Sequence, residues 1–99
     1  IEIINPPEKD NHNYFKYMVV LLQDDRSKVH KELEKLEISP SGYVYEIPLH
    51  KLPVFSKHND ITLPKTEYMC ENHFCLPIFY SMTDEQAYHV SNSLKVILG

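Results

Sequence analysis

The chain has 99 residues, and its 10 basic and 14 acidic side chains give a formal net charge of −4 at pH 7. This length fits one small domain and excludes a two-domain enzyme, while the 42% share of hydrophobic residues excludes a disordered chain. The acidic balance excludes a general nucleic-acid binder, and no segment has the roughly 20 consecutive apolar residues of a membrane span, so we expect neither kind of partner.

The first 13 residues are polar and contain two prolines, which predicts an N-terminal arm ahead of a single domain over residues 14–99. The chain begins at Ile1 with neither an initiator Met nor a basic n-region. We therefore expect no signal peptide and interpret the chain as a fragment of a longer protein. Residues 14–22 are aromatic and β-branched with one charge, which predicts a central strand because both faces are largely apolar.

Capping residues follow this strand, and apolar residues then recur at positions 29, 33 and 36, which predicts a short amphipathic helix over residues 27–36. Residues 43–47 alternate well enough to predict a second strand, with Tyr43 and Tyr45 on one face. Prolines at positions 48 and 53 bracket the next four residues, so we expect an irregular loop there.

The second half of the chain carries clearer start signals for helices. Thr62 suits an N-cap and Pro64 suits the first turn, which predicts a helix over residues 64–72. Residues 74–78 are typical of a short strand, which Pro77 places at the edge of a sheet. Thr83 and Gln86 have the spacing of a capping box, and an apolar stripe at positions 87, 90, 94 and 97 extends the last helix to the end.

The predicted order is therefore β-α-β-loop-α-β-α. Such an order favours an α+β fold with a small, mostly antiparallel sheet and about three helices on one of its faces.

Few residue groups in this sequence could support catalysis or bind a metal. Only two glycines are present, so the sequence has neither a Gly-rich phosphate loop nor a Gly-x-Ser-x-Gly elbow, and no catalytic residue is assigned. Cys70 and Cys75 fall at a predicted helix end and the strand after it, a poor geometry for a bridge, so we expect reduced thiols in a cytoplasmic protein. With His73 and the nearby His58 they offer soft ligands, but zinc sites usually use two separate knuckles, and we expect no metal site.

The loop between the two prolines is the best candidate for a ligand site. His50 can donate a hydrogen bond to a phosphate or a hydroxyl, and Lys51 adds a positive charge beside it. Tyr43 and Tyr45 approach from the predicted second strand. These four residues could recognise a sugar or a phosphate, although a lone histidine is more often without such a role.

Four segments, taken in order, resemble a known family over residues 14–98. They are the strand that leads to Asp25-Arg26, the tract over residues 44–55 with Pro48-Leu49-His50-x-x-Pro53, Leu63-Pro64-x-Thr66-Glu67, and Met82-Thr83-Asp84-Glu85-Gln86. Together they are similar to the C-terminal small domain of the DegT/DnrJ/StrS sugar aminotransferases, which are fold-type I enzymes. Two positions depart from the family pattern: the acid precedes the arginine in Asp25-Arg26, and Glu46 stands where the family often has proline or an aromatic.

The resemblance implies a parent enzyme that moves an amino group from glutamate to the keto group of a nucleotide-linked sugar. Pyridoxal phosphate (PLP) would be bound by the large domain of the same chain, through a Lys and an Asp outside these residues, and none is expected in the fragment. By position, His50 and Tyr45 match substrate-facing residues, with Tyr43 and Lys51 as neighbours. The fragment alone would be inactive, and the full-length protein would be a homodimer.

The surface that faces the large domain should be an exposed apolar patch that promotes self-association of the fragment. A different class of function also fits: a free-standing α+β module, binding or regulatory, that uses the loop around His50 to hold a small ligand. The sequence upstream of Ile1 would discriminate the two, since the fragment requires a large α/β domain there and the module requires a start codon.

Overall fold

The computed structural model describes residues 1–5, 7 and 11–99 of the chain. Its elements, in chain order, are β1 (Glu2–Ile3), β2 (Tyr17–Val20), α1 (Arg26–Lys35), the 3-10 helices η1 (Leu49–Lys51) and η2 (Pro53–His58), α2 (Pro64–Asn72), β3 (His73–Leu76) and α3 (Asp84–Leu98). The arrangement is α+β with a small antiparallel sheet, which confirms the predicted fold class.

The three strands form one antiparallel sheet in the order β1-β2-β3. Val20 of β2 lies opposite Glu2 of β1 on one side and opposite His73 of β3 on the other. β2 is therefore central, as its apolar faces predicted. β1 was not expected: it lies in the predicted arm over residues 1–13, of which residues 6 and 8–10 lie outside the described residues.

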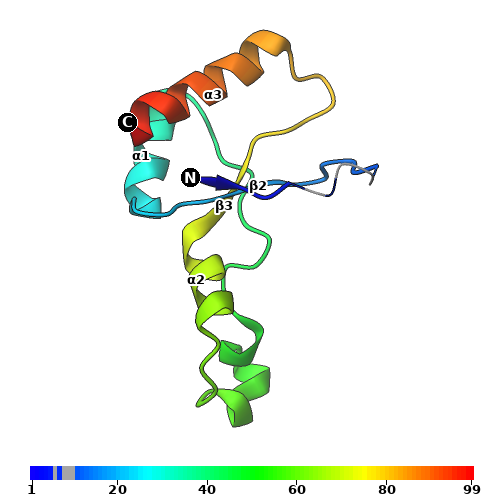
Figure 1. Ribbon diagram of the computed structural model, residues 1–99, viewed down its shortest axis with the longest axis vertical. Helices are drawn as coiled ribbons and strands as arrows, with labels where there is room; N and C mark the ends of the chain where they lie inside the picture. The colour runs from blue at the N-terminus through cyan, green and yellow to red at the C-terminus, as the bar shows by residue number, and fades with distance from the viewer. Residues whose placement is uncertain (6, 8–10) are drawn as a thin grey trace.

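The core lies between the sheet and two helices. Val19 of β2 and Phe74 of β3 are adjacent in the sheet and fully buried, and they pack against α1 and α3. The buried cluster consists of Val19, Leu21, Val29, Leu33, Ile38, Phe74, Val90 and Leu94. In Figure 1, α1 and α3 lie together at one end of the molecule beside the sheet, so the predicted stripes of both helices meet in one core.

The helix starts follow local capping chemistry. The Thr83 hydroxyl accepts from the Gln86 N–H at 3.2 Å, and the Gln86 side chain accepts from the Thr83 N–H at 2.9 Å, which confirms the predicted capping box of α3. α2 spans the predicted residues, but its N-cap is Leu63 rather than Thr62. The reason is that the Glu67 carboxylate accepts the Leu63 N–H at 3.1 Å, so a side chain of the helix itself, rather than the Thr62 hydroxyl, accepts a backbone donor at the helix start.

The predicted second strand over residues 43–47 is wrong. Gly42 has a φ of +79°, a left-handed conformation that turns the chain away after residues 41–42 have hydrogen-bonded to the backbone of Cys75. The Val44 N–H then donates to the imidazole of His73 instead of to a strand. Tyr43 and Tyr45 consequently point into different surroundings.

Residues 47–67 extend away from the sheet and include η1, η2 and the first turn of α2; we call this segment the tip. Figure 1 shows the tip in green and yellow-green at the end of the molecule opposite α3. η2 has no buried residue, and the tip is connected back to the sheet by α2, which runs directly into β3.

Candidate functional site

His50 is the buried side chain of the tip. Pro48 precedes η1 and Pro53 begins η2, so each proline fixes the backbone at the start of a short helix, and the Lys51 N–H donates to the Pro48 carbonyl at 2.9 Å to close η1. This turn directs His50 inward, where it is only 7% exposed. The predicted loop is thus a pair of 3-10 turns built around an imidazole.

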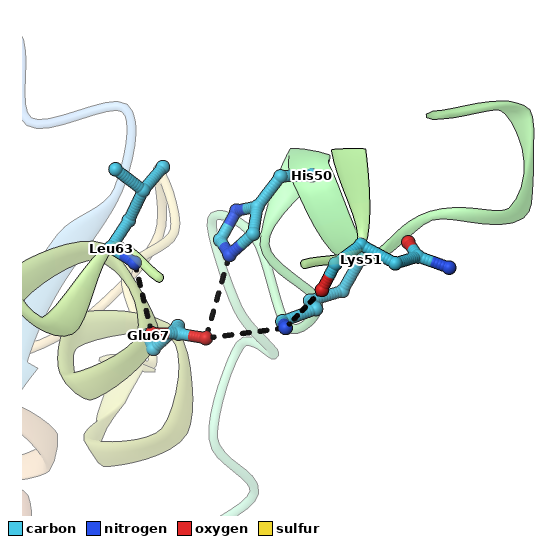
Figure 2. Close-up of polar contacts among 5 residues, drawn as sticks. His50, Lys51, Leu63 and Glu67 are labelled. Carbon is cyan, nitrogen blue, oxygen red and sulfur yellow. Dashed lines mark hydrogen bonds and ion pairs between the residues drawn. The ribbon is translucent and has the colours of Figure 1, made fainter. Parts of the chain in front are cut away.

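Three groups converge on Glu67 at the start of α2, as Figure 2 shows. Its Oε1 lies 3.4 Å from His50 Nε2 and 3.7 Å from Lys51 Nζ, and its Oε2 accepts the Leu63 N–H. Lys51 Nζ also donates to the backbone carbonyl of Asn59 at 2.9 Å. One carboxylate therefore joins η1, the segment after η2 and the N-terminus of α2.

Tyr43 belongs to a second cluster, at the end of α2 that leads into β3. The Arg26 guanidinium lies 4.3 Å from the centre of the Tyr43 ring and donates through one nitrogen to the carbonyls of Cys70 at 2.8 Å and His73 at 3.0 Å. The rings of His30 and His73 lie about 6 Å from that of Tyr43. None of these partners contacts His50 through the interactions that the described residues make.

The four predicted site residues are therefore distributed over three surroundings. His50 and Lys51 meet at Glu67, Tyr43 packs beneath Arg26, and Tyr45 is 71% exposed. Glu46, the residue that departs from the family pattern, is exposed as well. The geometry supports a polar pair at His50 and Lys51 more directly than a continuous four-residue surface.

His73 uses both ring nitrogens to hold the backbone. Nε2 accepts from the Val44 N–H at 2.9 Å, so the proton is on Nδ1, which donates to the carbonyl of Met69. Cys70 and Cys75 are free and buried, and burial raises the pKa of both thiols. A buried thiol with a raised pKa is a poor nucleophile and a poor metal ligand, and the described residues contain no group of three His, Cys, Asp or Glu arranged for a metal.

Sequence reasoning missed the central residue of the candidate site, Glu67, and assigned no role to His30. The signal for Glu67 was present in the sequence: an acid follows four residues after Leu63, at a helix start without a capping side chain. The Nε2 of His30 is buried without a partner, and its ring packs edge-on against Phe74. Burial lowers the pKa of His30, and the charge of Arg26 lowers it further.

An apolar groove of about 650 Å³ lies between α3 and the sheet. Its walls include Ile1 and Ile3 at β1, Leu76 of β3, and Val90 and Leu98 of α3. None of the residues that line the groove lies in the tip, so the groove is a surface separate from the His50–Glu67 pair.

Comparison with known proteins supplies the class of the domain. The family model described as "DegT/DnrJ/EryC1/StrS aminotransferase family" matches residues 1–95, and the chain therefore belongs to that family. It is also 35% identical over 81 residues to the uncharacterized protein MJ1066 of Methanocaldococcus jannaschii. That match covers 79% of this chain and 20% of MJ1066, so the chain spans about a fifth of the length of this relative.

PLP requires a lysine for the Schiff base and an acidic partner for the pyridine nitrogen. Lys51 Nζ lies 3.7 Å from the Glu67 carboxylate and donates to the Asn59 carbonyl at 2.9 Å. In the described part of the chain, no helix combines the length and the apolar character that crossing a bilayer demands.

Proposed function

We propose that the chain is the C-terminal domain of an aminotransferase that transfers an amino group from glutamate to the keto group of a nucleotide-linked sugar. The observation that carries this proposal is the family match over residues 1–95 together with buried His50 in the tract that resembles the family's substrate-facing one, where His50 and Lys51 both lie near Glu67. Such an enzyme would supply amino sugars for polysaccharide biosynthesis in the cytoplasm, and it would act as a homodimer.

In this proposal the chain's own residues bind and orient the substrate. PLP, bound by the large domain, supplies the electron sink for moving the amino group. Lys51 offers positive charge to the diphosphate, and His50 faces the sugar from a fixed position. Tyr45, which is exposed, provides an aromatic ring for stacking, and Tyr43 holds the segment that carries Tyr45 against Arg26.

The apolar groove is the surface that we assign to the large domain. MJ1066 is about five times as long as the matched segment, and a domain interface in such a chain needs an apolar face like this one. Alone, the 99-residue chain should self-associate through the groove. Sedimentation at increasing concentration tests this, with Ile78→Glu, at a groove residue that is 41% exposed, as the variant expected to remain monomeric. A wild-type chain that stays monomeric at high concentration would contradict the assignment.

The test of activity uses the full-length protein that carries this chain, with glutamate and nucleotide-linked 3-keto and 4-keto hexoses. We expect formation of 2-oxoglutarate with the full-length protein and none with the 99-residue chain. His50→Ala should raise the KM for the sugar at least tenfold, while Lys57→Ala, an exposed cation in the same segment, should not change it. Ligand binding without amino transfer would instead favour the free-standing module.

A further inference from the structure

We propose that Glu67 is a positioning residue that keeps the proton of neutral His50 on Nε2 and so presents Nδ1 as a hydrogen-bond acceptor to a hydroxyl of the ligand. The assignment of Glu67 depends on the structure alone, whereas the identity of the ligand as a sugar depends on the function proposed above. The proposal extends that function, because it states which kind of ligand group donates a hydrogen bond to His50.

The direction of the His50–Glu67 hydrogen bond follows from the carboxylate. An ionised carboxylate only accepts hydrogen bonds, so the ring nitrogen that faces Oε1 at 3.4 Å must carry the proton. In neutral imidazole the other nitrogen, Nδ1, is then an acceptor. The contact is long for a hydrogen bond. It can still fix the position of the proton because His50 is buried and little water competes for the ring.

Glu67 is itself held in place from two sides. Its Oε2 accepts the Leu63 N–H, one of the unpaired donors at the start of α2, and Lys51 Nζ lies near Oε1. Figure 2 shows the carboxylate between the helix start and the imidazole. Turning away from His50 would therefore cost the carboxylate its bond to the Leu63 N–H.

Nδ1 of His50 remains available to a ligand. Among the described residues, the one buried side-chain polar atom without a partner is His30 Nε2, and no described group bonds to His50 Nδ1. Nδ1 thus reaches the surface of the tip. An acceptor there binds an O–H or N–H, such as a sugar hydroxyl, and does not bind a fully ionised phosphate, which has no hydrogen to donate. The contact with phosphate is therefore assigned to Lys51.

Glu67→Gln gives a sharp test. The Leu63 N–H needs an acceptor, so the new amide oxygen should stay on Leu63 and its NH₂ should face His50. The imidazole can accommodate a donor by moving its own proton, so the variant should carry His50 as the Nδ1–H tautomer. Nitrogen-15 NMR of histidine-labelled chain, recorded where His50 is neutral, identifies which ring nitrogen is protonated.

We expect Nε2–H in the wild type, Nδ1–H in Glu67→Gln, and Nε2–H in the matched control Glu71→Gln, an exposed acid on the same helix. The Thr83 N–H signal of the distant capping box, recorded on a uniformly nitrogen-15-labelled sample of each variant, reports that the variant is folded. A proton that stays on Nε2 in Glu67→Gln, or that lies on Nδ1 in the wild type, overturns the proposal. If Glu67→Gln fails to fold, Glu67→Asp serves: its shorter carboxylate should withdraw from His50, and an unchanged Nε2–H signal with the same exchange rate would overturn the proposal.

In the full-length protein, Glu67→Gln should raise the KM for the sugar substrate about tenfold and leave kcat nearly unchanged, because Nδ1 would become a donor facing the ligand hydroxyl. An inverted tautomer with an unchanged KM would support the role of Glu67 and contradict the proposed contact between His50 and the sugar. The two proposals can therefore fail separately.

Discussion

The packed layer of sheet, α1 and α3 and the tip over residues 47–67 are stabilised by different forces. In the layer, apolar side chains such as Leu33 and Phe74 are fully buried. In the tip, Val54 and Leu49 are exposed, and the buried side chain is an imidazole held by a carboxylate. The layer gains its stability from burial of apolar area, whereas the tip takes its shape from prolines and polar contacts.

This difference separates substitutions that should unfold the chain from substitutions that should only rearrange the tip. A substitution in the layer should unfold the whole chain, because the same cluster joins both helices to the sheet. A substitution in the tip should change the position of His50 or Glu67 and leave the layer intact. Four predictions test this comparison, from the largest expected effect to the smallest.

The first prediction compares the same truncation in the two regions. Phe74→Ala should lower the free energy of unfolding by about 3–5 kcal/mol, since it opens a cavity in the core. Phe55→Ala, at a side chain that is 37% exposed in the tip, should cost less than about 1 kcal/mol. Urea unfolding followed by circular dichroism measures both. Equal losses would mean that the tip and the layer share one core.

The second prediction concerns Arg26, which joins α1 to the end of α2. Arg26→Ala removes the donors to the Cys70 and His73 carbonyls and the cation above Tyr43, and should cost about 2 kcal/mol. Lys28→Ala, at an exposed position on α1, is the control and should cost almost nothing. Hydrogen exchange should quicken at the Val44 amide in the arginine variant and stay unchanged in the control. An unchanged Val44 amide would show that Arg26 does not anchor the segment before the tip.

The sequence was sufficient to predict most of the layer. The α2 limits, the capping box at Thr83 and Gln86, and the central place of β2 each follow from signals within a few residues of the element concerned. The expected strand over residues 43–47 failed because the competing partner of Val44, the ring of His73, lies 29 residues away. Alternation describes a strand only when a neighbouring backbone is available to pair with it.

The candidate site was predictable only in part, for the same reason. The two prolines marked the loop around His50, and proximity in sequence paired it with Lys51. Glu67 lies 17 residues from His50 and meets it only because α2 folds back over η1. Tyr45 and Tyr43 were placed on one face by alternation, but the left-handed turn at Gly42 removed the strand that this reasoning required.

The third prediction uses His30, which lies between the core and the Tyr43 cluster. Burial lowers the pKa of His30 below its usual 6.5, so the unfolded chain binds this proton more tightly than the folded chain does. The free energy of unfolding should therefore fall as the pH drops from about 6.5 towards the lowered pKa of His30. Above about pH 6.5 it should no longer change through this group. His30→Phe keeps the ring contacts with Phe74 and Tyr43 and removes the unpartnered nitrogen. It should add about 1 kcal/mol at pH 7 and flatten the acid side of the profile. Urea midpoints from pH 5 to 8 measure this, and an unaltered pH profile would contradict it.

The smallest expected effect is at Glu37, which ends α1 with a φ of +60°. The Glu37 N–H donates to the Glu34 carbonyl and the Ile38 N–H to the Leu33 carbonyl, the pattern of a Schellman turn, in which glycine is the usual residue. Glu37→Gly relieves roughly 1–2 kcal/mol of left-handed strain. The glycine also costs roughly 0.5–1 kcal/mol because the unfolded chain gains conformational entropy, so we expect a net increase of about 0.5 kcal/mol in the free energy of unfolding. The reverse exchange beside the tip, Gly42→Ala, meets no atom within 4 Å of the new Cβ, so it adds only backbone strain of roughly 1–2 kcal/mol, which a lower unfolded-chain entropy offsets by roughly 0.5–1 kcal/mol, for a net loss of about 0.5 kcal/mol. Thermal unfolding of both variants compares the two left-handed turns. A gain at Glu37 without a loss at Gly42 would mean that the turn before the tip can relax, and that the packed layer alone requires a fixed backbone.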